Sequence, residues 1–323
     1  MAFPPEHYVR RKKSELPQAV RHVLQHPGID VIVCNTLALA YAVADETKSI
    51  PVVTVLHDIE QIYSWRRFLR SDWTPYKLVY FADWFKVRLW ENRLLRSSRN
   101  LIVMSKMDKR RVREINSRAP IAVVPNGVDT KYFNFHERLS ADPNILFVGN
   151  FAYPPNEDGF WYFYREIFPS VRKQVPAASL WAVGRDPTPE MCELQHQDVQ
   201  VRVTGFVPDM RSYYEKSAVC VVPIRFGGGT RLKVLEAFSV GVPVVSTTVG
   251  IEGIPASPEE HLLVRDTARE FAHGVAELLK RPESGQRLAS AARRLVEEKY
   301  DWSIIGIQLD GALASIRNGI AAV

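Results

Sequence analysis

The chain has 323 residues, 46% of them apolar and 24% charged, an ordinary balance for a globular protein large enough for two domains. Its three cysteines, Cys34, Cys192 and Cys220, are scattered, which argues against a disulfide framework or a zinc site and favours a reducing compartment. We see neither an apolar run long enough to span a bilayer nor a signal-peptide pattern at the start.

The net charge of +6 is unevenly distributed along the chain. Residues 1–135 hold 22 Lys and Arg against 13 Asp and Glu, which leaves 20 against 23 for the remainder. A basic N-terminal half indicates an anionic partner, either a membrane surface or a substrate. No nucleic-acid-binding motif accompanies the charge, so we expect no nucleic-acid partner.

In the first half of the chain, a helical pattern over residues 15–26 ends at Pro27-Gly28. Strand and helix patterns then alternate: strands over 30–35, 50–56, 100–104 and 121–124, with helices over 36–46 and directly after Ser105, which we expect to be an N-cap. This alternation predicts right-handed βαβ units and a parallel sheet covered on both faces.

Residues 59–97 interrupt the alternation and are dense in aromatic and basic side chains. Such interleaving is found at membrane interfaces. It is found more often in one or two helices whose aromatic stripe packs on a sheet. The sequence leaves both interpretations open.

The second half begins with a polar, irregular stretch over residues 132–143 that we interpret as a linker. A second α/β series follows, with strands over 144–148, 178–183, 199–204, 219–222, 242–246 and 261–264, and helices over 158–174, 210–216, 231–240, 268–280, 283–299 and 303–317. Two parallel-sheet domains in tandem predict a cleft between the carboxyl ends of their strands.

Residues 223–254 contain a triple-glycine turn, Gly227 to Gly229, between a short buried strand and a helix for which Thr230 is a good N-cap. Arg231 and Lys233 would lie in the first helical turn, where cations oppose the helix dipole. Their position makes sense if a polyanion binds there, since free N–H groups and the dipole both favour phosphate. The alternative is a sharp βα turn with two solvated cations.

The segment PIRFGGGTRLKVLEAFSVGVPVVSTTVGIEGI resembles the donor-site signature of family 4 glycosyltransferases of the GT-B fold, in the subgroup with the GGGTRLK form. Four more segments match that family in order and spacing: VVPNGVD (123–129), LFVGNFAYPPNEDGFWYF (146–163), TGFVPDMRSYYEKSAVCVVP (204–223) and YDWSIIGIQL (300–309).

The resemblance implies an α/β protein with two Rossmann-like parallel-sheet domains facing a cleft. Residues 1–135 would form the acceptor-side domain, residues 136–300 the donor-binding domain, and residues 301–323 a terminal helix returning to the N-terminal domain. Only about 29 residues precede Asp30, too few for the first β/α units of the family at ordinary element lengths. We therefore expect an incomplete, shortened N-terminal domain with an exposed sheet edge.

The resemblance also implies a retaining, hexosyltransferase-type enzyme that uses a nucleotide diphosphate sugar and needs no metal or other cofactor. Its acceptor would be a glycan or a lipid-linked glycan in surface polysaccharide or exopolysaccharide synthesis, at the cytoplasmic, inner face of the plasma membrane. The shortened N-terminus keeps a second hypothesis open, a non-catalytic or degenerate nucleotide-sugar-binding protein. An epimerase or phosphorylase of the same fold is disfavoured, because we can place neither its catalytic acids nor its cofactor lysine.

By this resemblance, Arg231 and Lys233 would neutralise the departing nucleotide diphosphate, and Glu236 would accept hydrogen bonds from the donor ribose. The catalytic residues implied are His57, Arg231 and Lys233, with His57 contacting the donor sugar or orienting the acceptor. The other donor-binding residues implied are Gly149, Asn150, Gly205, Phe206, Val207, Gly228, Gly229 and Thr230.

Two positions depart from the family pattern near the donor. The first acid of its Glu-x7-Glu motif falls at Gly228, and its usual Arg and Lys after the first donor-domain strand are replaced around Asn150 and Asn156. Arg231 and Lys233 would substitute for those missing cations. The structural alternatives are that His57 only ends a strand and that Glu236 is an ordinary helical glutamate.

Overall fold

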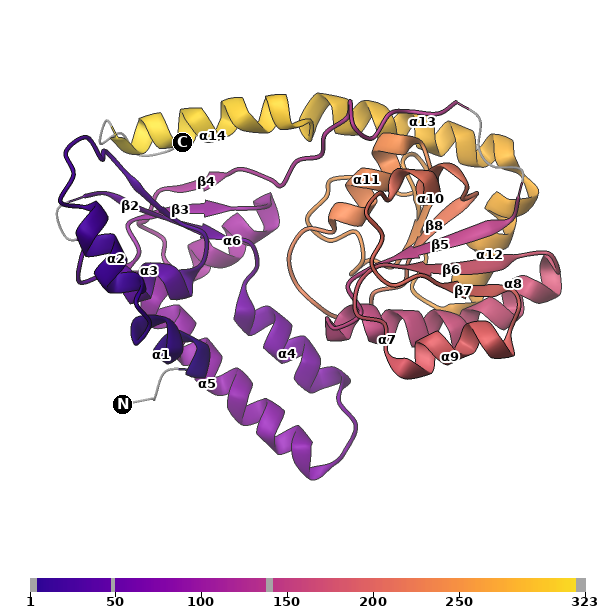
Figure 1. The fold of residues 1–323 in the computed structure, drawn as a ribbon, viewed down its shortest axis with the longest axis horizontal. Helices are drawn as coiled ribbons and strands as arrows, with labels where there is room; N and C mark the ends of the chain where they lie inside the picture. Colours follow the sequence, from indigo (N-terminus) through magenta and orange to yellow (C-terminus); the bar gives the residue numbers. More distant parts are fainter. Residues whose placement is uncertain (1–4, 48–49, 138–141, 318–323) are drawn as a thin grey trace. The chain divides into compact units, whose positions relative to one another are not determined.

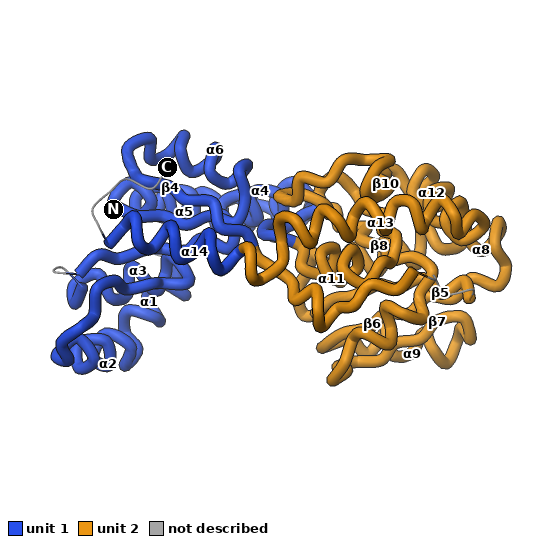
Figure 2. Tube along the Cα trace, turned by 90° about the horizontal axis from the view of Figure 1, so that it is seen from above, with its two compact units in different colours: residues 1–125, 226–230, 305–323 blue, residues 126–225, 231–304 orange. Residues whose placement is uncertain are grey.

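The computed structural model describes residues 5–47, 50–137 and 142–317 (Figure 1). Its contacts divide the chain into two compact units (Figure 2): unit 1, with residues 1–125, 226–230 and 305–323, and unit 2, with residues 126–225 and 231–304. Each unit contains one parallel sheet flanked by helices, which confirms the predicted α/β class. Residues 138–141 of the predicted linker and 318–323 of the predicted terminal segment lie outside the described residues.

Unit 1 contains a four-stranded sheet in the order β1-β2-β3-β4, with every pair parallel. Its strands are β1 (Ile32–Cys34), β2 (Val52–Leu56), β3 (Asn100–Val103) and β4 (Ile121–Val123). β1 lies at one edge, and the side chain of Val33 is 43% exposed there. The other strands are buried almost throughout, as their continuous apolar sequence predicts.

The helices of unit 1 are α1 (Glu6–Lys12), α2 (Leu16–Val23), α3 (Leu37–Val43), α4 (Glu60–Arg70), α5 (Pro75–Ser97), α6 (Lys106–Ile115) and most of α14 (Trp302–Arg317). The Ser105 hydroxyl accepts a hydrogen bond from the Asp108 N–H, which confirms that N-cap. α1 was not predicted. This short basic segment is organised around Tyr8, which is buried against the rings of Tyr41 and Trp90.

Helix α14 begins in unit 2 and continues in unit 1. There Ile305, Ala312 and Ile316 pack against apolar side chains of β2, β3 and β4. The terminal helix therefore covers one face of the four-stranded sheet.

Unit 2 contains a six-stranded parallel sheet in the order β10-β9-β8-β5-β6-β7. Its strands are β5 (Asn144–Val148), β6 (Ser179–Val183), β7 (Val201–Val203), β8 (Val219–Val222), β9 (Val244–Ser246) and β10 (Leu263–Val264). The chain builds the sheet outwards in one direction from β5 and in the other from β8. In such doubly wound sheets, ligands bind at the carboxyl ends of the strands where the order reverses.

The helices of unit 2 are α7 (Pro154–Tyr162), α8 (Phe168–Gln174), α9 (Pro189–Gln197), α10 (Arg211–Glu215), α11 (Leu232–Val240), α12 (Ala268–Lys280) and α13 (Pro282–Lys299). The single helix predicted over 158–174 is instead two helices joined by a π-helical turn, η1 (Phe163–Ile167). Pro169 has no N–H for a regular helical bond, so the hydrogen-bond pattern changes beside it. α9 was missed although Thr188 caps it and Pro189 begins it, a recognised start signal.

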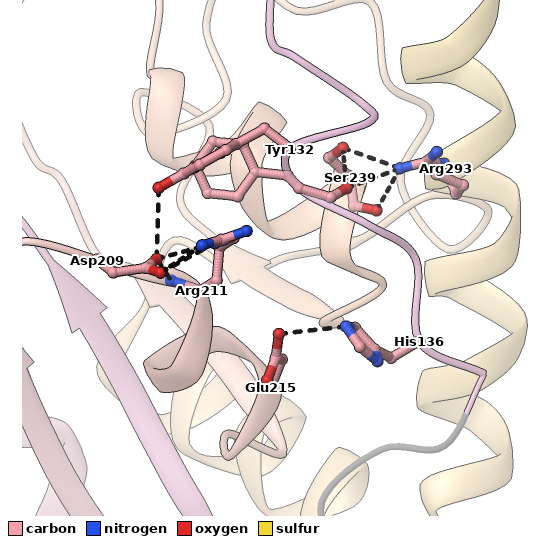
Figure 3. A network of polar contacts seen from close by, with 8 residues as sticks. Tyr132, His136, Asp209, Arg211, Glu215, Ser239 and Arg293 are labelled. Carbon is pink, nitrogen blue, oxygen red and sulfur yellow. Dashed lines mark hydrogen bonds and ion pairs between the residues drawn. The ribbon is translucent and has the colours of Figure 1, made fainter.

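The segment over residues 126–137 is anchored to unit 2 (Figure 3). The guanidinium of Arg293, on α13, donates to the carbonyl oxygens of Thr130 (3.2 Å), Phe133 (3.0 Å) and Ser239 (2.7 Å). Two further groups of contacts join this segment to α10 and the turn before it: Tyr132 with Asp209 and Arg211, and His136 with Glu215. The described part of the predicted linker is thus irregular in backbone but fixed in place.

Candidate functional site

Three glycines bring the carboxyl ends of β5, β6 and β7 close together. The N–H of Gly149 donates to Val183 O (3.1 Å), and the N–H of Gly184 donates to Gly205 O (3.2 Å). Gly184 has φ +144°, and a Cβ built on it would overlap the carbonyl oxygen of Gly149. Glycine is therefore required at 184 for this close approach. Gly149 and Gly205 were predicted from the sequence as donor-site residues, whereas Gly184 was not.

Helix α11 begins at Leu232, with Arg231 as its N-cap residue. The predicted N-cap at Thr230 is wrong, because Arg231 has non-helical angles (φ −88°, ψ 87°) and the helix starts one residue later than expected. No side chain makes a capping hydrogen bond at this end. The N–H of Val234 donates to Arg231 O (2.9 Å), and we infer that the uncapped N–H groups before it can bind an anion.

Lys233 lies in the first turn of α11 and is partly buried. Its Nζ donates to Asn156 Oδ1 (2.8 Å) and lies 5.3 Å from the ring centre of Phe147. Desolvation by burial lowers the pKa of Lys233 to about 7, and the positive charge of Arg231 acts in the same direction. Arg231 itself is only 8% exposed. Two cationic side chains are thus held close together with little access to water.

Asn156 is fixed in turn by the turn after β5. Its Nδ2 donates to the carbonyl oxygen of Asn150 (2.8 Å), which leaves its Oδ1 for Lys233. Its side chain also lies against Gly149, where a Cβ would come within 3.0 Å of Asn156 Cγ. Asn150 and Asn156, noted in the sequence only as replacements for cations, therefore position Lys233.

Glu236 follows Lys233 by almost one turn of α11 and is partly buried. Its Oε2 accepts a hydrogen bond from the hydroxyl of Tyr214 (2.8 Å). Burial raises the pKa of Glu236, while this hydrogen bond and the charge of Lys233 oppose the rise. The fully buried Tyr214 was not identified from the sequence, because a tyrosine in a short helix gives no signal that its hydroxyl meets a carboxylate.

Gly205, Phe206 and Val207 follow β7, next to Gly184. Gly205 has φ +69°, and the ring of Phe206 is 68% exposed. Val207 packs against the apolar cluster that also contains the buried side chains of α11. These three residues thus lie at the carboxyl ends of the strands, in the same row as Gly149 and Gly184.

The remaining predicted residues, His57, Gly228, Gly229 and Thr230, belong to unit 1. His57 follows β2 and is exposed, and its carbonyl oxygen lies 3.1 Å from a Cβ built on Gly229. A Cβ built on Gly228 would lie 3.4 Å from the Cβ of Asp58, so the carboxylate of Asp58 lies beside the position where the family carries an acid. Asp58 was not predicted from the sequence as a site residue.

Within the described ranges, no group of three or more His, Cys, Asp or Glu side chains is placed to hold a metal ion. A search of the same residues finds no helix that combines the length and the apolar character needed to cross a bilayer. Metal-independent donor use stays a prediction.

Two family models match the two halves of this chain. The model described as "Glycosyltransferase Family 4" matches residues 2–132, and the model described as "Glycosyl transferases group 1" matches residues 142–281. The chain belongs to the family 4 glycosyltransferases. The match to the second model includes the glycine turns, Lys233 and Glu236 of unit 2.

A curated relative of this glycosyltransferase, an "Uncharacterized 44.6 kDa protein in cps region" from Klebsiella pneumoniae, is 26% identical over 165 residues. That alignment covers 49% of our chain and 42% of the relative, so less than half of the relative is matched.

Solved structures of glycosyltransferases share its fold. Sucrose-phosphate synthase from Thermosynechococcus elongatus has a TM-score of 0.75 at 19% identity, with 98% of our chain and 81% of that chain covered. Anabaena Alr3699/HepE in complex with UDP has a TM-score of 0.70 at 15% identity, with 93% and 82% covered. These similarities confirm the predicted GT-B fold.

Proposed function

We propose that this glycosyltransferase transfers a hexose from a nucleotide diphosphate sugar, with retention of anomeric configuration and without a metal ion. The observation that carries the proposal is the pair of cations at the start of α11. Arg231 is buried, and the pKa of the neighbouring Lys233 is lowered to about 7. Such a pair is unfavourable in the unliganded protein and favourable once a diphosphate lies between the charges and the helix N-terminus.

The chemical role follows from where charge develops. When the glycosidic bond to the donor breaks, negative charge accumulates on the departing diphosphate, and fixed cations stabilise that charge in the transition state. Lys233 is held by Asn156 and the side chain of Arg231 is buried, so we infer that neither has to reorganise during the reaction. The carboxylate of Glu236 would accept hydrogen bonds from the donor ribose, and the backbone of Gly228, Gly229 and Thr230 would donate to the diphosphate. Gly149, Asn150, Gly205, Phe206 and Val207 would bind the same donor.

The comparisons support a uridine nucleotide and a glycan product. Alr3699/HepE, which shares the fold, was crystallised with UDP and with UDP-glucose. The Klebsiella relative is encoded in a cps region. We therefore propose UDP-sugar as donor and a glycan or lipid-linked glycan as acceptor, in surface polysaccharide or exopolysaccharide synthesis. We assign acceptor contacts to the N-terminal domain (residues 1–135), with His57 among them, and donor binding to residues 136–300.

A thermal-shift series with UDP, GDP and ADP tests the donor site directly, since a ligand of the folded state raises the melting temperature by mass action. We expect UDP to give the largest shift. Transfer is then measured with radiolabelled UDP- and GDP-sugars and lipid-linked acceptors. Lys233→Ala and Arg231→Ala should each cost about 2–4 kcal/mol of transition-state stabilisation, by analogy with the loss of one oxyanion donor.

Lys280→Ala, on the exposed end of α12, is the matched control and should leave kcat/KM unchanged. Unchanged kcat in both α11 variants would overturn the assignment of the diphosphate site.

A second function, nucleotide-sugar binding without catalysis, is favoured by one observation. Gly228 stands where the family carries the first acid of its Glu-x7-Glu motif. A folded protein that binds UDP but transfers and hydrolyses no donor would support this second function. Under the first proposal, Asp58 beside Gly228 supplies the missing carboxylate, so Asp58→Asn should lower kcat while UDP binding persists.

A further inference from the structure

Helices α4 and α5 form a hairpin that extends away from the sheet of unit 1 (Figure 1). The buried side chains of α5 are Val87, Trp90, Glu91 and Leu95, all in its second half. In α4 only Ser64 is buried. Apart from Val87, the distal half of the hairpin, residues 65–89, therefore lies outside the core of unit 1.

That distal half carries an unusual amount of exposed apolar surface. Seventeen large apolar side chains are exposed among the described residues, and eight of them lie between Leu69 and Leu89. The most exposed are Trp73 (92%), Leu78 (75%) and Tyr76 (70%), at and just after the turn between the helices. Concentrations of this kind mark interaction surfaces, whereas single exposed apolar residues need no explanation.

The surface is preformed, because rings from both helices support it from beneath. Trp65 lies 4.6 Å from Trp84 and Phe68 lies 5.4 Å from Phe81, measured between ring centres. A hairpin ordered in this way does not have to fold when it meets its partner.

The charge of the hairpin indicates what that partner is. Residues 60–97 contain eight Lys and Arg against four Asp and Glu. On α5, Phe81, Phe85 and Leu89 follow one another at intervals of four, and Arg93 continues the same row. Leu89, Arg93 and Arg96 line a pocket of about 400 Å³ together with Asn92 and Ser97. An apolar stripe thus leads directly into a basic pocket.

We propose that residues 65–97 dock this glycosyltransferase on an anionic lipid surface. The aromatic and aliphatic side chains around Trp73 enter the interface, and Arg93 and Arg96 bind the phosphate of a headgroup. Exposed Trp, Phe and Leu side chains bind at the membrane interface, and neighbouring Lys or Arg side chains add attraction to anionic lipid. The inference extends the peripheral membrane location that follows from the proposed lipid-linked acceptor.

Vesicle flotation of the full chain tests the proposal, with vesicles of phosphatidylcholine alone and of phosphatidylcholine with phosphatidylglycerol. We expect the protein to float with the anionic vesicles and to remain behind with the zwitterionic ones. The variant Trp73→Ser/Leu78→Ser/Phe85→Ser should weaken binding by at least about tenfold, since apolar insertion is lost. Arg93→Gln/Arg96→Gln should weaken it by roughly 10- to 30-fold at low salt.

Matched controls lie in unit 2. Val199→Ser removes an apolar side chain that is 97% exposed, and Arg287→Gln/Arg294→Gln removes two exposed charges. Both should float like the wild type. Wild-type binding by the triple serine variant, or equal binding to both vesicle types, would overturn the proposal.

A second copy of the chain is the competing occupant of this surface. If the wild type sediments as a dimer, the serine variant as a monomer, and neither floats with vesicles, the surface is a dimer interface and the proposal is wrong. The UDP thermal shift is measured on the same samples. The residues proposed to bind the donor all lie outside residues 65–97. Loss of flotation with an unchanged UDP shift therefore separates failure of docking from failure of the donor site.

Discussion

The start of α11 in unit 2 and the tip of the α4–α5 hairpin in unit 1 depart from ordinary protein architecture in opposite ways. In unit 2, groups that water would stabilise are buried: Arg231 is 8% exposed, and the pKa of Lys233 is lowered by desolvation. In unit 1, groups that water disfavours are exposed, with Trp73 at 92%. Each arrangement is unfavourable in the isolated chain and becomes favourable with a partner of matching chemistry.

The two regions also differ in how firmly the surrounding structure holds their side chains. Arg231 and Lys233 lie at the start of α11 in unit 2. The strands and helices of this unit form two large buried apolar clusters, so the positions of the two cations are fixed. The hairpin tip is supported by ring contacts between α4 and α5. Precise placement suits the stabilisation of charge in a transition state, whereas a fluid lipid surface does not require it.

The largest effect that we expect comes from Gly184→Ala. A Cβ at this position overlaps the carbonyl oxygen of Gly149 at φ +144°, so the strand ends of unit 2 must move apart. Chemical denaturation should show a loss of at least about 3 kcal/mol in the free energy of unfolding. Gly311→Ala, in α14 with open space around its Cβ position, should be neutral or stabilising by up to about 1 kcal/mol. Equal stability of the two variants would contradict the role given to Gly184.

The next largest effect should follow removal of Arg293. Its guanidinium donates to three backbone carbonyls, so Arg293→Ala should lower the free energy of unfolding by about 2–3 kcal/mol. The neighbouring Arg294 is exposed on the same helix, and Arg294→Ala should change stability by less than about 0.5 kcal/mol. A neutral Arg293→Ala would show that the segment over residues 126–137 is held by other contacts.

A third effect concerns pH and the donor site. The pKa of Lys233 is about 7 in the unliganded protein, and a bound diphosphate favours the charged amine. Above pH 7 the amine must therefore take up a proton when UDP binds, so the Kd for UDP should rise with pH by up to about tenfold per unit. Isothermal titration in buffers of different ionisation enthalpy would detect that proton. In Lys233→Met the affinity should be lower and the proton uptake absent; persistent uptake would assign it to another group.

The smallest effect should come from Trp73→Ser. Because its side chain is 92% exposed, the free energy of unfolding should change by less than about 0.5 kcal/mol. Trp90→Ala, in α5 of the same hairpin but only 8% exposed, should cost about 3–5 kcal/mol. A strongly destabilised Trp73→Ser would mean that the hairpin tip belongs to the core rather than to a docking surface.

The sequence by itself determined the strand order of both units and most of their helices. It missed α1 and α9, predicted one helix for α7 and α8, and left residues 59–97 as one or two helices. Continuous Val- and Ile-rich runs specified the strands, because both faces of a parallel sheet are buried. The GGGTRLK segment also indicated an anion site. Cations at a helix N-terminus oppose the helix dipole, and this local conflict can be recognised without knowing the fold.

The tertiary structure alone decided which side chains meet. Tyr214 and Glu236 are 22 residues apart, and Lys233 and Asn156 are 77 apart, so no local pattern could pair them. The start of α11 also depended on context, because the backbone angles of Arg231 displaced the N-cap from Thr230. The aromatic residues over 59–97 fitted two interpretations in sequence, and only their exposure in the folded hairpin separates a buried stripe from a surface. Burial is a property of the whole fold, since the partners that cover a side chain come from distant parts of the chain.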